Sequence, residues 1–241
     1  MSNVMNHNLC SCENCQHQMC TKRVPIFASL EAEELRRVAN LILRKEYAKG
    51  ELILMEGESY DNLVIINQGQ VKAFRNTNEG KEQILYIFSE GDFFGERNIL
   101  QEQESAYHVE ALEKTKICMI NKKDFQTLLR ELPEIGIKII DELLNRIEGL
   151  EDTIQNMGTK NVDVRINAVL LEFANKYGKN KERGLEIDLP LSREGIANYI
   201  GLTRETVSRK LNLLQEEGII EMLGNKKIIL LDRHALEVLM E

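Results

Sequence analysis

A stretch near the C-terminus constrains the fold of this chain more than any other feature. From Leu191 it reads LSREGIANYIGLTRETVSRKLNLLQEEGIIEMLGNKKIILL. Ser192 and Thr203 belong to the residue types that cap helix N-termini, and each precedes a segment with helical spacing of apolar residues. Gly201 lies between the two segments, and Gly218 is placed to end the second one. The pattern predicts two short helices that are joined by a tight turn.

The apolar residues of this stretch predict which side of each helix is buried and where a hairpin forms. Two short apolar runs flank Gly224-Asn225, which is the signal of a two-residue hairpin turn. The stretch therefore predicts a helix, a turn, a second helix and a wing. The positions expected to be buried are Ile196, Ala197 and Ile200 in the first helix and Val207, Leu211 and Leu214 in the second.

The opposite side of the second helix carries groups that can read DNA bases. Glu205, Ser208, Arg209 and Asn212 follow one another at spacings of three and four, so they share a face. An arginine can donate two hydrogen bonds to guanine, a carboxylate can accept from the cytosine amine, and a serine hydroxyl suits several bases. Any amphipathic helix has a charged outer face, but the preceding helix, the glycine turn and the wing favour DNA binding. The residues expected to flank this face and complete the DNA-binding set are Arg193, Thr203, Arg204 and Lys210.

The length and composition fit a globular protein of two domains. The chain has 241 residues, of which 43% are hydrophobic and 29% charged, and a net charge of −8. That charge argues against a uniformly basic nucleic-acid-binding protein, but it allows a local basic face. No apolar run approaches the roughly 18 residues that cross a bilayer, and the N-terminus lacks the layout of a signal peptide. We therefore expect a cytoplasmic protein without a membrane partner.

The chain divides into four segments by composition. Residues 1–24 are polar and rich in cysteine, and residues 25–130 consist mainly of short apolar runs between glycines, which predicts an antiparallel sandwich or roll. Residues 131–158 read as one long helix that begins at Pro133, and residues 159–241 form a small α/β domain. The predicted fold class is α+β.

The long helix carries an apolar seam at heptad spacing, which is typical of a helix that pairs with a second copy. A single helix packing on its own domain is the alternative, but the seam is narrow and its flanks are charged, so we favour a homodimer. The residues of the seam are Ile140, Leu143, Ile147, Leu150, Ile154 and Met157.

The cysteines are clustered. Cys10, Cys12, Cys15 and Cys20 lie within the first 20 residues, and Cys118 stands apart. In a reducing compartment, clustered thiols more often bind metal or act in redox chemistry than form structural disulfides. Three uses stay open at this point: an iron–sulfur cluster, a thiol–disulfide switch, and a zinc site of four thiolates or of three with His7 or His17.

With these motifs in place, the chain resembles the CRP/FNR superfamily of bacterial transcription regulators. The stretch YAKGELILMEGESYDNLVIINQGQVKAFRNTNEGKEQILYIFSEGDFFGE is similar to the cyclic-nucleotide-binding-type β-roll (jelly roll) of that family, and GIANYIGLTRETVSRKL to its recognition motif. The resemblance implies a β-roll, a long dimerisation helix and a C-terminal winged helix-turn-helix. It also implies double-stranded DNA and RNA polymerase as partners.

Two branches of the family differ in their sensors. The cyclic-AMP-binding branch has Gly-Glu followed, after about nine residues, by Arg-Ser. Here Gly95-Glu96 is present, but QEQESAYHVEAL has no Arg-Ser, Arg97 lies in the wrong place, and the next arginine is Arg130. A cyclic nucleotide phosphate needs a cation or a backbone nest. We therefore expect no cyclic nucleotide as cofactor.

The FNR-like branch holds an oxygen-labile [4Fe-4S] cluster with N-terminal cysteines and one cysteine in the β-roll. The resemblance implies Cys12, Cys15, Cys20 and Cys118 as ligands, with Cys10 as an alternative. The spacing C-x2-C-x4-C is one residue shorter than the enteric C-x2-C-x5-C.

The recognition helix matches the same branch. Glu205, Ser208 and Arg209 match its E-x-x-S-R pattern, which implies a TTGAT-N4-ATCAA-like palindrome. A family member that binds DNA constitutively is a further alternative. We expect no enzyme, because no phosphate-binding loop, nucleophile elbow or zinc-protease motif occurs.

Overall fold

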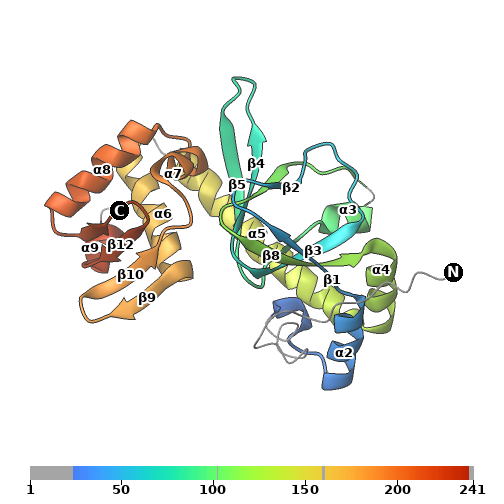
Figure 1. Cartoon of the computed structure of the whole chain (residues 1–241). Coiled ribbons are helices and arrows are strands. Elements are labelled where there is room, and N and C mark those ends of the chain that lie inside the picture. Colours follow the sequence, from blue (N-terminus) through green and yellow to red (C-terminus); the bar gives the residue numbers. More distant parts are fainter. Residues whose placement is uncertain (1–23, 102, 159–160, 239–241) are drawn as a thin grey trace.

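The computed structural model describes residues 24–101, 103–158 and 161–238. A β-roll and a small helical domain with a wing lie at opposite ends of the molecule, and the long helix α5 (Pro133–Gly158) runs from the first to the second (Figure 1). The predicted α+β class and the predicted order of β-roll, long helix and winged helix-turn-helix are confirmed. Among the described residues, no helix is long and apolar enough to span a bilayer.

Two antiparallel sheets of the described chain form the roll. Their strand orders are β1-β8-β3-β6 and β2-β7-β4-β5. The apolar runs that the sequence offers as strands all form strands, whereas β1, β6 and β7 were not predicted; the runs are ELILM, NLVIIN, QVKAF, QILYIF and KICMI. The strands are β1 (Leu43–Tyr47), β2 (Leu52–Leu54), β3 (Asn62–Gln68), β4 (Val71–Asn76), β5 (Glu82–Phe88), β6 (Phe93–Phe94), β7 (His108–Ala111) and β8 (Thr115–Asn121).

Strand β3, in the middle of the first sheet, is buried on both faces, whereas β1 at the edge of that sheet is mostly exposed. Along β3, Val64 and Ile66 pack against the second sheet, while Leu63 and Ile65 pack against helices. This explains why the strand reads as a continuous apolar run, since alternation is lost when both faces are buried. The helical elements of this part of the chain are η1 (Pro25–Phe27), α2 (Ala32–Leu41), α3 (Glu96–Gln101) and α4 (Lys122–Glu131).

The C-terminal domain forms as its capping residues predict. The Ser192 side chain accepts a hydrogen bond from the Gly195 amide, and Thr203 accepts one from Thr206. Gly201 has a φ of +68°, which a side chain would strain. The elements are α6 (Val162–Tyr177), β9 (Gly178–Lys181), β10 (Gly184–Asp188), α7 (Arg193–Ile200), α8 (Arg204–Glu216), β11 (Ile220–Leu223), β12 (Lys227–Leu230) and α9 (Arg233–Val238).

The wing differs from its prediction in one detail. Leu223 pairs with Lys227, so the loop contains residues 224–226 instead of Gly224-Asn225 alone. The third loop residue has a structural use, because its carbonyl accepts a hydrogen bond from the Leu189 amide at 2.8 Å. The wing is thereby tied to the segment that precedes α7.

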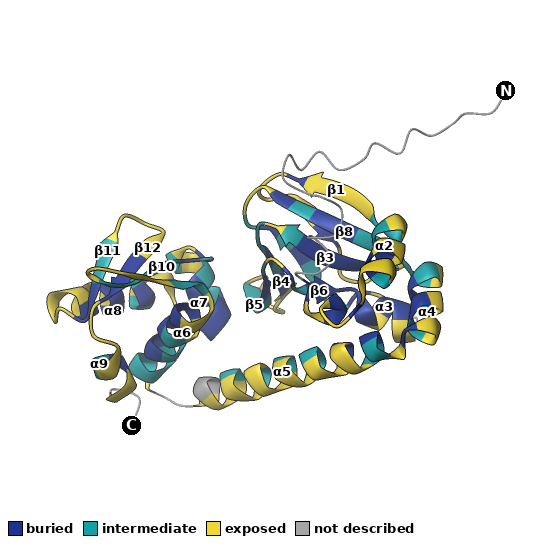
Figure 2. Cartoon of the chain, turned by 90° about the horizontal axis from the view of Figure 1, so that it is seen from below, coloured by how far each residue is buried: buried dark blue, intermediate teal, exposed yellow. Residues whose placement is uncertain are grey.

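The β4–β5 hairpin of the roll packs against the C-terminal domain. Phe74, Ile84 and Ile87 of this hairpin belong to the same apolar cluster as the core of α6, α7 and α8. Hydrogen bonds reinforce the contact, such as the one from the Gln83 side chain to the Tyr199 carbonyl at 3.3 Å. Figure 2 shows that α5, in contrast, is exposed along most of its length.

Candidate functional site

Helix α8 presents the predicted reading face to solvent. Val207 and Leu214 are fully buried and Leu211 is 1% exposed, so the helix is fixed with this side inward. On the opposite side Glu205, Arg209 and Asn212 are exposed and Ser208 is half-buried. The predicted orientation of the helix is therefore confirmed.

The residues that flank this face have different surroundings. Thr203 caps α8 and Arg204 occupies its first position, and both are exposed. Arg193 begins α7 and is half-buried, with its guanidinium 3.3 Å from the sulfur of Met222. Arg204 is thus the flanking cation that is open to a phosphate, while Arg193 lies between the first helix of the motif and the wing.

Lys210 is buried, although it was predicted to flank the exposed face of α8. The residue is 8% exposed, and its ammonium is 3.1 Å from the carboxylate of Asp163 in the first turn of α6. A phosphate contact needs a side chain that reaches solvent, so the expectation that Lys210 is exposed is wrong, and its contact with DNA stays a prediction. The lysine instead joins α8 to α6.

A surface hollow of about 790 Å³ lies beside the reading face. Its lining combines α8 residues such as Glu205, Ser208 and Arg209 with Val162 and Asp163 from the start of α6. The contribution of α6 was not predictable from the sequence, because more than 40 positions separate it from α8 and no local pattern connects the two. The hollow widens the candidate interface beyond the recognition helix.

Cys118 lies on the helix-covered side of the first sheet. It is 5% exposed and packs in one apolar cluster with Ile65, Phe93 and Val24. Val24 is the first described residue and follows Cys20 by four positions, a separation that an extended chain spans with at most about 14 Å. The other predicted ligands, Cys12 and Cys15 with Cys20 and the alternative Cys10, lie outside the described residues.

A cavity of about 350 Å³ lies between the roll and α5. Glu96 lines it and is 7% exposed; one carboxylate oxygen is 3.4 Å from the Arg146 guanidinium, and the other has no hydrogen-bond partner among the described residues. Burial raises the pKa of Glu96, and the nearby Arg146 opposes that rise. The carboxyl of the Gly95-Glu96 pair is therefore paired with an arginine of the long helix.

The other arginines at this cavity also have partners. Arg75 is 2.9 Å from a carboxylate oxygen of Glu56, and Arg97 donates to the Gln103 side chain at 2.9 Å. Arg97 also lines the cavity, although it directly follows Gly95-Glu96 and so does not occupy the sequence position of the Arg-Ser pair. These pairings leave the cations of the cavity engaged by groups of the protein itself.

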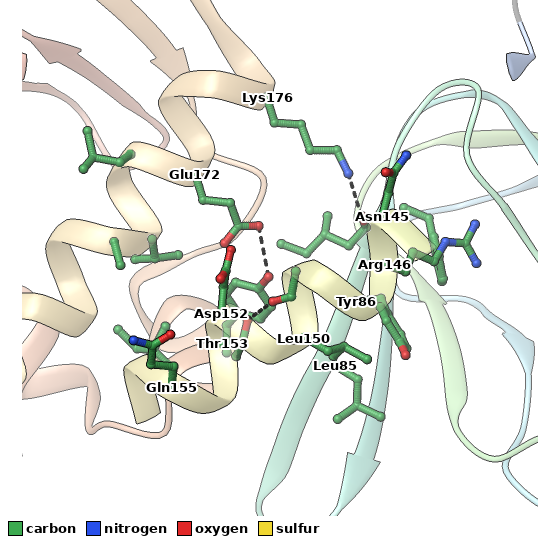
Figure 3. A pocket seen from close by; sticks show the side chains of 18 of the residues that line it. Leu85, Tyr86, Asn145, Arg146, Leu150, Asp152, Thr153, Gln155, Glu172 and Lys176 are labelled. Atoms are coloured by element: carbon green, nitrogen blue, oxygen red, sulfur yellow. Dashed lines mark hydrogen bonds between the residues drawn. The ribbon is translucent and has the colours of Figure 1, made fainter. Parts of the chain in front are cut away.

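A second cavity, of about 630 Å³, separates α5 from the C-terminal domain. Figure 3 shows Glu172 and Lys176 of α6 facing α5 across it. Glu172 accepts a hydrogen bond from the Tyr199 hydroxyl at 3.0 Å, and Lys176 is 3.3 Å from Asp92 of the roll. Burial raises the pKa of Glu172, while Tyr199 and Lys176 oppose that rise.

The predicted seam of α5 divides between two environments. Ile140, Ile147 and Ile154 are 57%, 50% and 68% exposed, as a dimer seam requires. Leu143 is half-buried against the cluster around Cys118, and Leu150 is half-buried beside the two cavities. Met157 lies outside the residues whose side chains the structure describes. The exposed stripe continues instead through two residues that the sequence analysis left out, Ile137 at 61% and Leu144 at 57%.

Comparison with known proteins divides the chain into the same two domains, the β-roll and the C-terminal domain. The cyclic nucleotide-binding domain model matches residues 44–131, and the Crp-like helix-turn-helix domain model matches residues 164–239. The electron transport regulator A of Shewanella oneidensis is 32% identical over 95% of this chain and 89% of its own length. The chain belongs to the CRP/FNR family.

Two further members of the CRP/FNR family illustrate the likeness. The fumarate and nitrate reduction regulatory protein of Yersinia pestis is 30% identical over 88% of this chain and 84% of its own length. The solved structure of FixK2 from Bradyrhizobium japonicum is 26% identical, covers 83% of this chain and 98% of its own, and superposes with a TM-score of 0.75. This CRP/FNR chain is a DNA-binding transcription regulator.

Proposed function

We propose that the protein is a homodimeric regulator of the FNR type that senses oxygen or redox state. In this proposal Cys12, Cys15, Cys20 and Cys118 hold a [4Fe-4S] cluster, with Cys10 as the alternative N-terminal ligand. Thiolates are the usual ligands of such clusters. The names of two relatives, which refer to electron transport and to fumarate and nitrate reduction, support a regulator of respiratory genes.

One structural observation carries the sensor part of the proposal. Cys118 and Val24 belong to the same packed cluster on the helix side of the first sheet. Val24, four positions after Cys20 in the sequence, therefore lies on the same side of the sheet as Cys118. A ligand in the β-roll and ligands before Val24 can meet at this place without a long connection.

The DNA-binding part rests on the exposed face of α8. Glu205, Ser208 and Arg209 match the E-x-x-S-R pattern that the resemblance connects with a TTGAT-N4-ATCAA-like palindrome. A palindrome requires two copies of the helix, which lie about 34 Å apart on adjacent half-sites. Arg209 would contact guanine, Glu205 cytosine, and Arg204 a phosphate.

The exposed stripe of α5 supplies the interface for a second copy. Its five apolar residues follow at spacings of three, four, three and seven, which suits a coiled-coil seam. An exposed apolar stripe of this length is unusual on a monomer. The residues of the stripe are Ile137, Ile140, Leu144, Ile147 and Ile154.

The proposal assigns no cyclic nucleotide to the roll. Glu96 is engaged by Arg146, and the Arg-Ser pair of the cyclic-AMP-binding branch is absent from the sequence. RNA polymerase is the expected partner at promoters that the protein activates. The cluster, when bound, supplies the oxygen-sensitive chemistry, and the chain's own residues bind it and pass its state to the DNA-binding domain.

The test is to purify the protein without oxygen and to record its absorbance, iron, sulfide and zinc before and after air is admitted. The expected result is a band near 400 nm, about four iron atoms per chain, and loss of the band in air with weaker binding to the palindrome. Bound zinc without iron would favour a structural zinc site, and metal-free protein that loses thiols in air would favour a disulfide switch. DNA affinity that is the same before and after air would point to a constitutive regulator.

A further inference from the structure

The first sheet places Cys118 in line with a very short strand that contacts two other parts of the molecule. Cys118 of β8 pairs with Ile65 of β3, and Ile65 pairs on its other side with Phe93 of β6. Directly paired residues of neighbouring strands point to the same face, and the three side chains indeed share one apolar cluster. Two strand spacings, or about 10 Å, separate the ends of this row.

Strand β6 is the shortest strand of the row. It contains residues 93–94 and forms the edge of its sheet. Gly95 follows it with a φ of +90°, and a Cβ there would lie 2.4 Å from the Asn62 carbonyl oxygen. The position of β6 is thus set closely by β3, while its other edge is available for contacts outside the sheet.

The first of these contacts is with α5. Arg146 donates a hydrogen bond to the Phe93 carbonyl at 2.6 Å, and its guanidinium lies over the rings of Phe93 and Phe88 at 4.4 and 5.0 Å from their centroids. The same guanidinium is 3.4 Å from the carboxylate of Glu96. Arg146 therefore attaches the middle of the long helix to β6 and to the residue that follows Gly95.

The second contact is with the C-terminal domain. Asp92 immediately precedes β6, and its carboxylate is 3.3 Å from the ammonium of Lys176 at the end of α6. That ammonium also donates to the Ile87 carbonyl at 3.2 Å, and the Tyr177 hydroxyl is 3.2 Å from the Ser89 hydroxyl. The segment around β6 thus contacts both the helix that carries the exposed stripe and the domain that carries α8.

We propose that β6 transmits displacements of Cys118 to α5 and to the DNA-binding domain. Arg146 is the positioning residue through which such a displacement reaches α5. This inference rests on the proposed sensing role of Cys118 and adds its mechanism. A displacement of Cys118 moves Ile65 and Phe93, because a close-packed row transmits movement. Arg146 then changes the orientation of α5, which places the exposed stripe against the second copy.

A double-mutant cycle between positions 118 and 146 tests this inference. The four proteins combine cysteine or alanine at position 118 with arginine or methionine at position 146. Arg146→Met keeps the side-chain volume but removes the hydrogen bonds. All four proteins also carry Glu96→Gln, so that no buried carboxylate is left without its cation. In proteins that keep Arg146, Cys118→Ala is expected to change palindrome affinity at least tenfold. In proteins with Arg146→Met, the same change is expected to be less than twofold. Such non-additivity is the signature of coupling.

A second measurement on the same proteins does not depend on what Cys118 binds. The dimer dissociation constant from sedimentation is expected to rise at least tenfold with Arg146→Met and less than threefold with Glu96→Gln alone. Arg146→Lys, which retains a cation but cannot reach both acceptors, should fall between them and is the substitute if the methionine variant does not fold.

The outcomes separate the inference from the proposed function. Equal effects of Cys118→Ala in both backgrounds, or unchanged dimerisation with Arg146→Met, would overturn the inference while sensing through Cys118 stands. A Cys118→Ala protein that binds DNA as the parent does, with or without air, would refute both the inference and sensing through Cys118.

Discussion

The Lys210–Asp163 ion pair offers a direct test of how the recognition helix is held. Lys210 is 8% exposed, and the two charged groups are 3.1 Å apart. We expect Lys210→Met to destabilise the C-terminal domain and to leave phosphate contacts intact. Methionine keeps most of the buried stem, so the substitution removes mainly the charge and its hydrogen bond.

The magnitude follows from the exposure of the two partners. Asp163 is 49% exposed, so water can solvate its carboxylate once the lysine is gone, and the loss falls well short of that for a fully buried pair. A hydrogen bond to a charged group then contributes about 1–2 kcal/mol. For a unit of roughly 80 residues, this lowers the Tm by about 4–16 °C.

The assay is the salt dependence of palindrome binding, measured together with thermal unfolding. Each lost phosphate contact reduces the slope of log K against log salt by about 0.9, or nearly 2 for a dimer. Lys210→Met should keep the parent slope and lower the Tm. The matched control is Arg204→Met, which changes an exposed cation on the same helix and should reduce the slope without changing the Tm.

The reverse pattern would refute this reasoning. If Lys210→Met lowered the slope by nearly 2 and left the Tm unchanged, the lysine would contact phosphate in the complex. The ion pair with Asp163 would then exist in the free protein alone. Arg209→Ala serves as a positive control for base reading, since it should cost about 1–3 kcal/mol per half-site and relax the preference for guanine.

Three further predictions concern other parts of the molecule. Leu144→Glu should convert the dimer to a monomer in sedimentation at micromolar concentration, because it introduces a charge into the exposed stripe of α5. Glu148→Gln is the control. A Leu144→Glu protein that remains dimeric would contradict the proposed seam. Gly95→Ala should lower the Tm far more than Gly80→Ala, since both have positive φ but at Gly95 alone of the two a Cβ meets backbone, at 2.4 Å; equal losses would refute this. Burial raises the pKa of Glu172 above its usual value of 4.5, so the stability that this carboxyl contributes is lost as the pH rises from 4.5 through the raised pKa. In urea unfolding, the stability of Glu172→Gln should therefore increase relative to that of the parent as the pH rises above 4.5. A stability difference that does not change with pH would contradict this.

The sequence by itself determined those features that depend on local patterns. Ser192 and Thr203 fixed the starts of α7 and α8, because a capping side chain satisfies amides within three residues of its own position. The burial of Val207, Leu211 and Leu214 followed from helical periodicity, and that in turn predicted which side of α8 faces solvent. Pro133 marked the start of α5 in the same way.

The tertiary structure decided whatever depends on contacts between distant segments. Lys210 is as polar in sequence as Arg209, and its burial follows from α6 packing alongside α8. Leu143 fits the heptad as well as Leu144 does, but the roll covers one side of α5 and leaves the other open. Strand β6 is too short to give a periodic signal, and it forms because β3 supplies its hydrogen-bond partner. The local spacing of residues specifies on which side of its own helix or strand a side chain lies. The other segments of the fold determine whether that side is buried or exposed.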